Sequence, residues 1–326
     1  MKTDQNFAFA YDIFKDGTSK KLDVNATSAA DKASSAQGFK WVHVQGNIDQ
    51  LRSVLNEQDL DPLVVNALSA EETRPRCTPS EKGAILILRG VNLNEGAEPE
   101  DMISIRIWVE QNRVISCGIR RLKAIDDVVD MITSGRAPKT SGDLVAVFAL
   151  RLADRVEPVV AELNEQVDGV EENLADAEMP VVRRHLAEIR RSSIILRRYM
   201  FPQRDALTTF ELEGFSWISK LTLSHLREAV ERVTRVCEEL DSIRDRAQII
   251  HDQILDERAE FMNKQMLVLT IVAAFFLPVG FLTGLLGMNV GGVPLMDNPF
   301  GFAAVCGFIL FVFGIEYLIF KKLKLF

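Results

Sequence analysis

Two long uncharged runs lie close to the C-terminal end of the chain. Residues 266–286 contain no Asp, Glu, Lys or Arg, and residues 300–315 form a second run that continues to residue 320 past a single acid, Glu316. A helix needs about 20 apolar residues to cross the hydrocarbon core of a bilayer. The pattern therefore predicts two transmembrane helices, which form a pore domain over residues 266–326.

The segment between the two runs, residues 287–299, is rich in Gly, Pro and Asn and carries one acid but no Lys or Arg. Such a composition is typical of a turn between antiparallel helices. Lys321 and Lys322 follow the second run, and Arg258 and Lys264 precede the first. Because positive residues flank membrane spans on the cytoplasmic side, we expect both chain termini in the cytoplasm and the connecting loop outside.

The first part of the chain mixes strand and helix patterns. Apolar, β-branched or aromatic runs predict strands near residues 7–13, 41–44, 84–91, 103–109 and 114–119. Helical periodicity predicts helices at residues 50–58, 62–70 and 124–132. This mixture indicates an α/β domain over residues 1–135, and the stretch 135–142, with its Gly, Ser and Pro, marks its end.

Only helical patterns follow from residue 143. We expect one helix at 143–177 and an antiparallel second helix at 181–200, separated by Pro180 and ended by Pro202. The first helix is acidic, and the second carries arginine pairs every seven residues, at Arg183, Arg184, Arg190, Arg191, Arg197 and Arg198. We expect an ion-pair face between neighbouring helices. The alternative is that the acidic helix binds cations and the basic helix holds it until they arrive.

A very long helix is predicted after Gly214. No strong helix breaker precedes Pro278, so residues 216–286 form a helix of about 105 Å at 1.5 Å per residue. Its apolar positions recur every three or four residues and need partner helices to cover them. The sequence therefore predicts an oligomer in which residues 143–265 form a helical hairpin and a long helical funnel.

Charge and cysteine content narrow the function classes. The net charge is −8, and because residues 266–326 contribute three lysines and two acids, the first 265 residues carry −9. Such a surface attracts cations and disfavours nucleic-acid partners. The four cysteines are far apart without a CxxC pair, which disfavours a disulfide framework and indicates a reduced, cytosolic compartment for the soluble part. The sequence has no nucleophile–base pair or phosphate loop, so we expect neither an enzyme nor a cofactor.

One face of the first predicted span combines small and polar residues. Steps of three or four residues connect Asn263, Met266, Thr270, Ala273, Leu277, Gly280, Gly284 and Gly287. This stripe predicts a pore lining, and the alternative is close packing of small residues between helices. Gly287, Met288 and Asn289 end the span, where the Asn289 amide oxygen can accept hydrogen bonds from the water shell of a metal ion.

Two further positions are candidates for cation or proton chemistry. His251 and Asp252 are adjacent on the long helix and form a candidate metal site in the funnel, with a ligand set that zinc accepts. Glu316 lies near the cytoplasmic end of the second span. We expect it to reach towards the membrane surface or to pair with a nearby lysine. The alternative is a proton relay.

Several motifs resemble the CorA metal-ion transporter family over essentially the whole chain. They are residues 269–289, which end in Gly287-Met288-Asn289, the two C-terminal spans with a lysine-rich tail, and Tyr-Met-Phe-Pro-Gln-Arg at 199–204. Three stretches are similar to the zinc-transporting ZntB branch of that family: GMNVGGVP at 287–294, ETRPRC at 72–77 and LRGVNL at 88–93.

The resemblance implies a homopentamer with a cytoplasmic α/β/α domain, a funnel, and a pore lined by the first span, with the second span outside it. By position, the pore-facing residues are Asn263, Met266, Leu269, Leu277 and Gly280, and the pore mouth is formed by Gly287, Met288 and Asn289. The resemblance also implies that Met266 and Leu269 are hydrophobic constrictions that gate by dewetting.

The resulting expectation is a zinc transporter of the bacterial inner membrane, with protons as an optional coupling ion and membrane lipids as its surroundings. A magnesium or cobalt channel gated by cytoplasmic metal is the alternative, and Ni²⁺ is a further candidate cargo. The sequence departs from magnesium-transporting members at Val293-Pro294-Leu295 and at Gly280, which weakens that assignment. A membrane-tethered sensor or scaffold is an alternative from another class.

Overall fold

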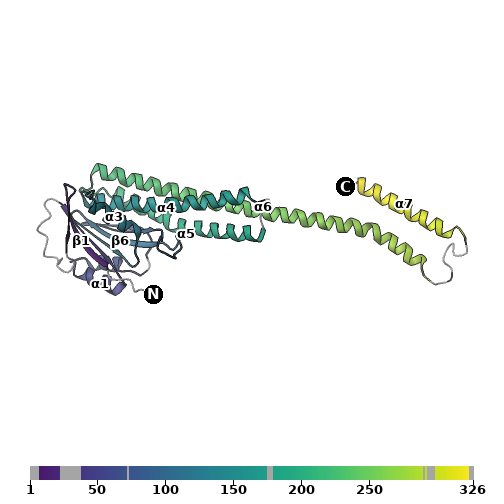
Figure 1. Ribbon diagram of the computed structural model, residues 1–326, viewed down its shortest axis with the longest axis horizontal. Coiled ribbons are helices and arrows are strands. Elements are labelled where there is room, and N and C mark those ends of the chain that lie inside the picture. Colours follow the sequence, from purple (N-terminus) through teal and green to yellow (C-terminus); the bar gives the residue numbers. More distant parts are fainter. Residues whose placement is uncertain are drawn as a thin grey trace. The chain divides into compact units, whose positions relative to one another are not determined.

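The computed structural model describes residues 7–22, 38–71, 73–174, 179–288, 291 and 298–322. The chain divides into two compact units, Met1–His251 and Asp252–Phe326. One helix, α6 (Lys220–Leu286), contributes residues to both (Figure 1).

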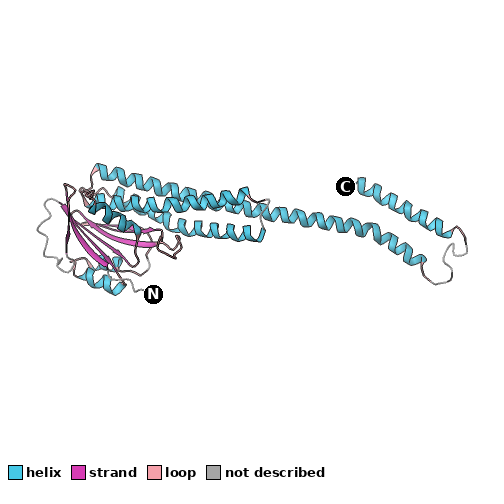
Figure 2. Cartoon of the chain, in the orientation of Figure 1, coloured by secondary structure: helices cyan, strands magenta, loops and turns pink. Residues whose placement is uncertain are grey.

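The first unit is built on a seven-stranded sheet (Figure 2). Its strands are β1 (Phe7–Phe14), β2 (Ser19–Leu22), β3 (Gly38–Gln45), β4 (Arg76–Ser80), β5 (Gly83–Gly90), β6 (Ile103–Glu110) and β7 (Arg113–Gly118). Their order is β2-β1-β3-β7-β6-β5-β4, and every neighbouring pair is antiparallel except β3 and β7, which are parallel. The five predicted strands are confirmed.

The sequence patterns missed β2 and β4, which form the two edges of the sheet. The sequence of β2 is Ser-Lys-Lys-Leu, and β4 contains Pro79 and buries none of its five residues fully. Edge strands have one unpaired side, so they need no apolar alternation and tolerate Lys and Pro. The signal used to find strands is therefore absent from both.

Helices cover both faces of the sheet, in agreement with the expected α/β/α arrangement. On one face, α1 (Ile48–Asn56) and α2 (Pro62–Leu68) bury Leu51, Leu55 and Leu68 against the strands. On the other face, α4 (Ser141–Glu172) contacts β5 and β6, and α5 (Met179–Leu212) contacts β4 and β5. The short helix α3 (Lys123–Thr133) packs on α4.

Several predicted helix boundaries are wrong. Helix α4 ends at Glu172 rather than at 177, and α5 begins at Met179, so that Pro180 lies in its first turn. Helix α5 continues through Pro202 to Leu212, because Gln203, Leu207 and Phe210 extend its buried stripe by three more turns. That packing outweighs the one backbone hydrogen bond that a proline removes. Helix α6 begins at Lys220 rather than at residue 216, since the Ser219 hydroxyl accepts from the Thr222 amide at 3.0 Å and caps the helix.

The predicted ion-pair face exists, but the acidic helix α4 uses α6 as its partner. Arg232 of α6 pairs with Glu157 at 2.7 Å, and Arg246 pairs with both Asp168 and Glu171 at 2.6 Å. No ion pair between α4 and α5 is found among the residues that the structure describes. The arginine-rich helix α5 also pairs with α6, through Arg197 and Asp241.

The second unit contains residues 252–286 of α6 and the whole of α7 (Gly301–Lys322). Helices α6 and α7 are both long and apolar enough to cross a membrane. Within this unit the Phe275 ring of α6 lies 5.7 Å from Phe313 and 5.4 Å from Phe320 of α7, measured between ring centroids.

Candidate functional site

The apolar part of α6 has one covered face and one open face. The half-buried positions Ile271, Phe275, Pro278, Leu282 and Leu286 recur every three or four residues, and Phe275 contacts α7. Leu277, Gly280 and Gly284 each lie two residues beyond one of these positions, which is about 200° around a helix of 3.6 residues per turn. They therefore lie on the face of α6 that points away from α7.

The predicted pore-facing residues are all exposed in the single chain. Met266 is 62% exposed, Leu269 70% and Leu277 71%, and Asn263 and Gly280 are also exposed. A Cβ atom added at Gly280 would meet no atom within 4 Å. The structure thus brings these residues to one uncovered helix face, which is apolar for most of its length and carries no formal charge from Met266 onward.

Polar side chains on this part of α6 bond to their own helix. The Thr270 hydroxyl donates to the Met266 carbonyl at 2.8 Å, and the Thr283 hydroxyl donates to Val279 at 2.9 Å. Such bonds satisfy the hydroxyl hydrogens inside a membrane and leave lone pairs on the oxygens. These hydroxyl oxygens are better suited to accept hydrogen bonds from the water shell of a metal ion than to replace that water as ligands of the ion.

The end of the span is only partly described. The Gly287 amide donates to the Thr283 carbonyl at 2.9 Å and continues the helical bonding. Its backbone is not left-handed, but a Cβ atom there would lie 3.0 Å from the Thr283 oxygen, so the tight backbone still favours glycine. Met288 is 52% exposed, and Asn289 lies outside the described residues.

The candidate funnel site at His251 and Asp252 gains no further ligands in the single chain. His251 is half-buried and Asp252 is exposed. The described part of the chain contains no group of three or more His, Cys, Asp or Glu side chains arranged to hold a metal ion. A complete site at this level would need ligands from another chain, and these two residues remain a prediction.

Three of the sequence motifs meet in the first unit, around Arg89 at the end of β5. The Arg89 amide donates to Gln203 Oε1 of α5 at 2.6 Å. The guanidinium of Arg89 donates to the carbonyl oxygens of Thr73 at 2.7 Å and Met102 at 2.9 Å, and lies 4.2 Å from the centre of the Tyr199 ring. The Arg89 side chain thus joins Thr73 to Tyr199, although these residues lie more than 100 positions apart in the sequence. The sequence analysis did not identify this role of Arg89.

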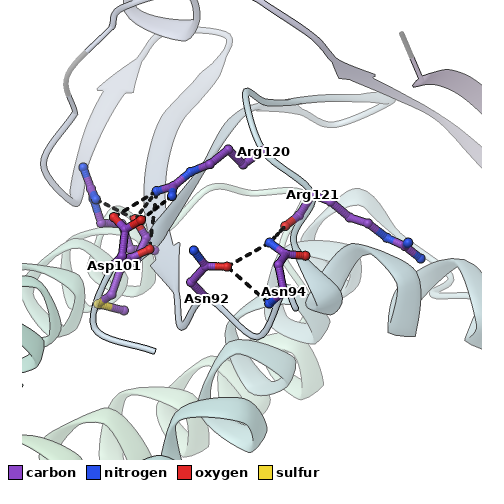
Figure 3. A network of polar contacts seen from close by, with 7 residues as sticks. Asn92, Asn94, Asp101, Arg120 and Arg121 are labelled. Carbon is purple, nitrogen blue, oxygen red and sulfur yellow. Dashed lines mark hydrogen bonds and ion pairs between the residues drawn. The ribbon is translucent and has the colours of Figure 1, made fainter. Parts of the chain in front are cut away.

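The chain that follows β5 is held by a second polar network (Figure 3). Asn92 Oδ1 accepts from the Asn94 side chain at 2.8 Å, and Asn94 Nδ2 also donates to the Arg121 carbonyl at 3.0 Å. Arg120 pairs with Asp101 at 2.5 Å, and this hydrogen bond lowers the pKa of the Asp101 carboxyl. These contacts fix the loop between β5 and β6. None of the five residues labelled in Figure 3 is a side chain of the kind that acts as an activated nucleophile.

A cavity of about 820 Å³ lies at the opposite end of the sheet, between the strand ends and the segment that joins α1 to α2. Trp108 lies in its wall, and its indole N–H donates to Glu110, which also pairs with Arg113 at 2.9 Å. Asp59, on the rim, has a left-handed backbone with φ of 51°. Local sequence patterns do not indicate this cavity, because its lining residues come from five stretches that are far apart along the chain: 12–14, 38–40, 58–64, 78–85 and 108–113.

The sequence of the chain matches a known family and named relatives. The profile of the family described as CorA-like Mg²⁺ transporter protein matches residues 36–322. The divalent cation transporter CmaX of Pseudomonas aeruginosa is 37% identical over 87% of this chain and 86% of its own. The zinc transport protein ZntB of Pectobacterium carotovorum is 34% identical over 84% of each chain.

Solved structures agree with this relationship. The full-length CmaX protein superposes with a TM-score of 0.82 at 33% identity, covering 99% of this chain and 100% of the other. The CorA magnesium transporter of Methanocaldococcus jannaschii has a TM-score of 0.78 at 17% identity, covering 97% and 98%, and shares the fold. The chain therefore belongs to the CorA-like Mg²⁺ transporter family.

Proposed function

We propose that this chain is a divalent-cation transporter of the bacterial inner membrane, with zinc as its cargo, and that it works as a homopentamer. Family membership supports transport of a divalent cation. Zinc is favoured because several relatives that match most of the chain are zinc transport proteins. The departures from the magnesium pattern at Gly280 and Val293 point in the same direction.

The observation that carries the proposal is the uncovered face of α6. Its residues are exposed in the single chain, whereas the opposite face packs on α7. In a ring of copies, this face lines the axis and α7 forms an outer layer. Lipid would cover an apolar face as well as another helix does, but the exposed glycines Gly280 and Gly284 on this face favour the close approach of neighbouring helices.

The chemistry of this face suits an ion that keeps its water. From Met266 onward it offers methylene groups, glycines and hydroxyl oxygens but no carboxylate to replace the hydration shell. A ring of Asn289 amides at the mouth would bind that shell by hydrogen bonds, which avoids most of the dehydration energy. Met266 and Leu269 would form narrow apolar rings that close the pore when water leaves them.

Electrostatics on the cytoplasmic side supports a cation as cargo. The first 265 residues carry a net charge of −9. Repeating that charge around a symmetric ring raises the local concentration of divalent cations near the axis. The same charge disfavours an anion as the transported species.

Flux into liposomes tests the proposal. The purified full-length chain is reconstituted, and uptake of Zn²⁺, Mg²⁺, Co²⁺ and Ni²⁺ is followed with and without a proton gradient. Zn²⁺ uptake that rises with the gradient is expected. Mg²⁺ flux indifferent to pH would instead identify a magnesium or cobalt channel, and absence of any flux would favour a sensor or scaffold anchored by its two spans.

Matched variants test which face of which helix lines the path. An added side chain at Gly280 or Gly307 meets no atom within 4 Å, but only Gly280 lies on the open face of α6. Gly280→Val is expected to abolish uptake, and Gly307→Val to retain it. Asn289→Ala should lose flux while its size-exclusion profile is unchanged. Equal uptake by Gly280→Val and Gly307→Val would refute the proposed pore lining.

A further inference from the structure

The cavity at the strand ends of the first unit shares no residue with the proposed transport path. Its deepest lining residues are Val64, Ile85 and Trp108, which are at most 8% exposed and belong to the hydrophobic core between the sheet and the helices α1 and α2. Leu60 also lines the cavity and packs against the same core. A volume of about 820 Å³ and an apolar floor are typical of a small-molecule site. An apolar group bound here would extend the core.

A row of charged residues crosses five neighbouring strands beside this apolar floor. The strand register aligns Lys20 of β2 with Asp12 of β1, Asp12 with Lys40 of β3, Lys40 with Arg113 of β7, and Arg113 with Glu110 of β6. Directly aligned residues of neighbouring strands point to the same face of a sheet. All of them except Lys20 line the cavity. The row contains three positive and two negative side chains, so one positive charge is in excess.

Lys40 carries the excess charge, because Arg113 is already neutralised. The guanidinium of Arg113 donates to the Gln58 carbonyl at 2.7 Å and pairs with Glu110 at 2.9 Å. Lys40 is half-buried and makes no ion pair with any residue that the structure describes, although Asp12 is its cross-strand neighbour. Its other neighbour in the row, Arg113, has the same charge, which is unfavourable on a sheet. A bound anion would compensate the ammonium of Lys40.

The rim of the cavity restricts that anion to a single negative charge. Asp59, Asp61 and Glu81 are exposed on the rim, where Lys82 is the only basic lining residue. Solvent and salt screen these exposed acids more than they screen the half-buried Lys40, so the row decides the sign of the ligand. The rim acids would still repel a second negative charge. A phosphate or a nucleotide is therefore disfavoured.

We propose that this cavity binds a small organic monocarboxylate with an aromatic or branched apolar body. Lys40 Nζ donates to the carboxylate, and the apolar body lies against Val64, Ile85 and Leu60. This site goes beyond the proposed transport function. It involves the first unit alone, so its test and the flux test have independent outcomes.

A matched series of ligands tests the chemistry of the site without any variant. The compounds 3-phenylpropionate, 3-phenylpropionamide and phenethylamine share a phenylethyl body and carry a negative, a zero and a positive charge. Each is titrated into the purified full-length chain by calorimetry, and the heat of titration into protein-free detergent is subtracted. Saturable binding of 3-phenylpropionate is expected, at least about tenfold tighter than binding of the amide or the amine, because a charge-assisted hydrogen bond is lost in both. Absence of saturable 3-phenylpropionate binding, or equal binding of the three compounds, would overturn the proposal.

Two lysine variants test which residue binds the carboxylate. Lys40→Gln should weaken 3-phenylpropionate binding by about tenfold. Lys20→Gln is the matched control, because Lys20 is an exposed member of the same row that does not line the cavity. It should change the affinity by less than about twofold, since an exposed charge is screened. Equal losses in the two variants, with thermal midpoints like that of the wild type, would refute the contact with Lys40.

Photo-crosslinking locates the bound acid in the chain. The probe is 4-benzoylbenzoate, an aromatic monocarboxylate. Its irradiated ketone takes a hydrogen atom from a nearby C–H group, and the two carbon radicals join, so the adduct mass is the sum of chain and probe. Mass spectrometry should find the adduct within the lining stretches 58–64 or 78–85, and excess 3-phenylpropionate should suppress it. Adducts found only elsewhere, or unaffected by the competitor, would contradict the proposed site.

Discussion

Lowering the pH should destabilise the first unit through a buried histidine, His43 of β3. Its side chain is 2% exposed, and its Nδ1 atom lies 2.8 Å from the Ser116 hydroxyl. Because Ser116 Oγ already accepts from the Trp41 indole at 2.9 Å, the Ser116 hydrogen is available for His43 Nδ1. The neutral His43 ring can therefore accept from Ser116 at Nδ1 and carry its own hydrogen on Nε2.

The size of this pH-dependent loss of stability follows from the difference in the pKa of His43 between the folded and unfolded chain. Burial lowers the pKa of His43 to about 3, from an ordinary value of 6.5. The unfolded chain therefore binds a proton below pH 6.5 that the folded chain refuses, and stability is lost as the pH falls from 6.5 towards 3. Between pH 7.5 and pH 5 the expected loss in the free energy of unfolding is about 2 kcal/mol.

The assay compares the wild type with His43→Asn in detergent. The asparagine side chain keeps an acceptor near the Nδ1 position but does not titrate. It gives up the ring contact with Phe9, whose centroid lies 5.2 Å away, so the variant should be less stable at pH 7.5. Thermal unfolding followed by tryptophan fluorescence should show a smaller decrease in midpoint between pH 7.5 and pH 5 for the variant.

The wild type and His43→Asn share all other titrating groups, so the contribution of those groups to the pH dependence cancels when the two decreases in midpoint are compared. If the midpoints of the wild type and of His43→Asn decrease in parallel over this pH range, the reasoning is wrong, and His43 is either hydrated or protonated in the folded state. A variant whose midpoint equals that of the wild type at pH 7.5 would also contradict the packing that the structure gives the ring.

Three further predictions concern contacts within the first unit. Arg89→Lys should lower the free energy of unfolding by about 1–3 kcal/mol, since lysine cannot donate to two carbonyls while lying flat on Tyr199. Thermal unfolding of the variant measures this loss, and a midpoint equal to that of the wild type would refute the prediction. Leu240→Ala removes a fully buried side chain of α6 and should cost about 2–5 kcal/mol, whereas Leu212→Ala, at a side chain 74% exposed, should change stability by less than about 0.5 kcal/mol. Arg246→Met should cost about 1 kcal/mol at low salt and less at high salt, because its ion pairs are partly exposed; a loss independent of salt would contradict that explanation.

The sequence predicted the parts of the fold that depend on local patterns. Five strands were found because central strands need apolar runs, and the two apolar spans were found from length alone. The open stripe on α6 followed from helical periodicity. Each of these signals lies within a window of about 20 residues or fewer.

Contacts between distant segments were not predictable in the same way. The hydrogen bond from Arg89 to Gln203 joins positions 114 residues apart, and no local pattern encodes it. The helix break expected at Pro202 failed for a related reason, because the packing of residues beyond the proline outweighs its local preference. Likewise, the charges on α4 were visible, but their partners on α6 depended on how the helices pack.

The edges of the sheet restrict how copies of this chain can associate. Lys20 and Lys21 lie on β2, and Arg76 and Pro79 lie on β4, so a strand from another molecule would meet charge or a missing amide at either margin. Extension of the sheet from chain to chain is therefore blocked. Association between copies of this chain would then use helical surfaces, so that each copy keeps its own seven-stranded sheet even where many copies lie close together.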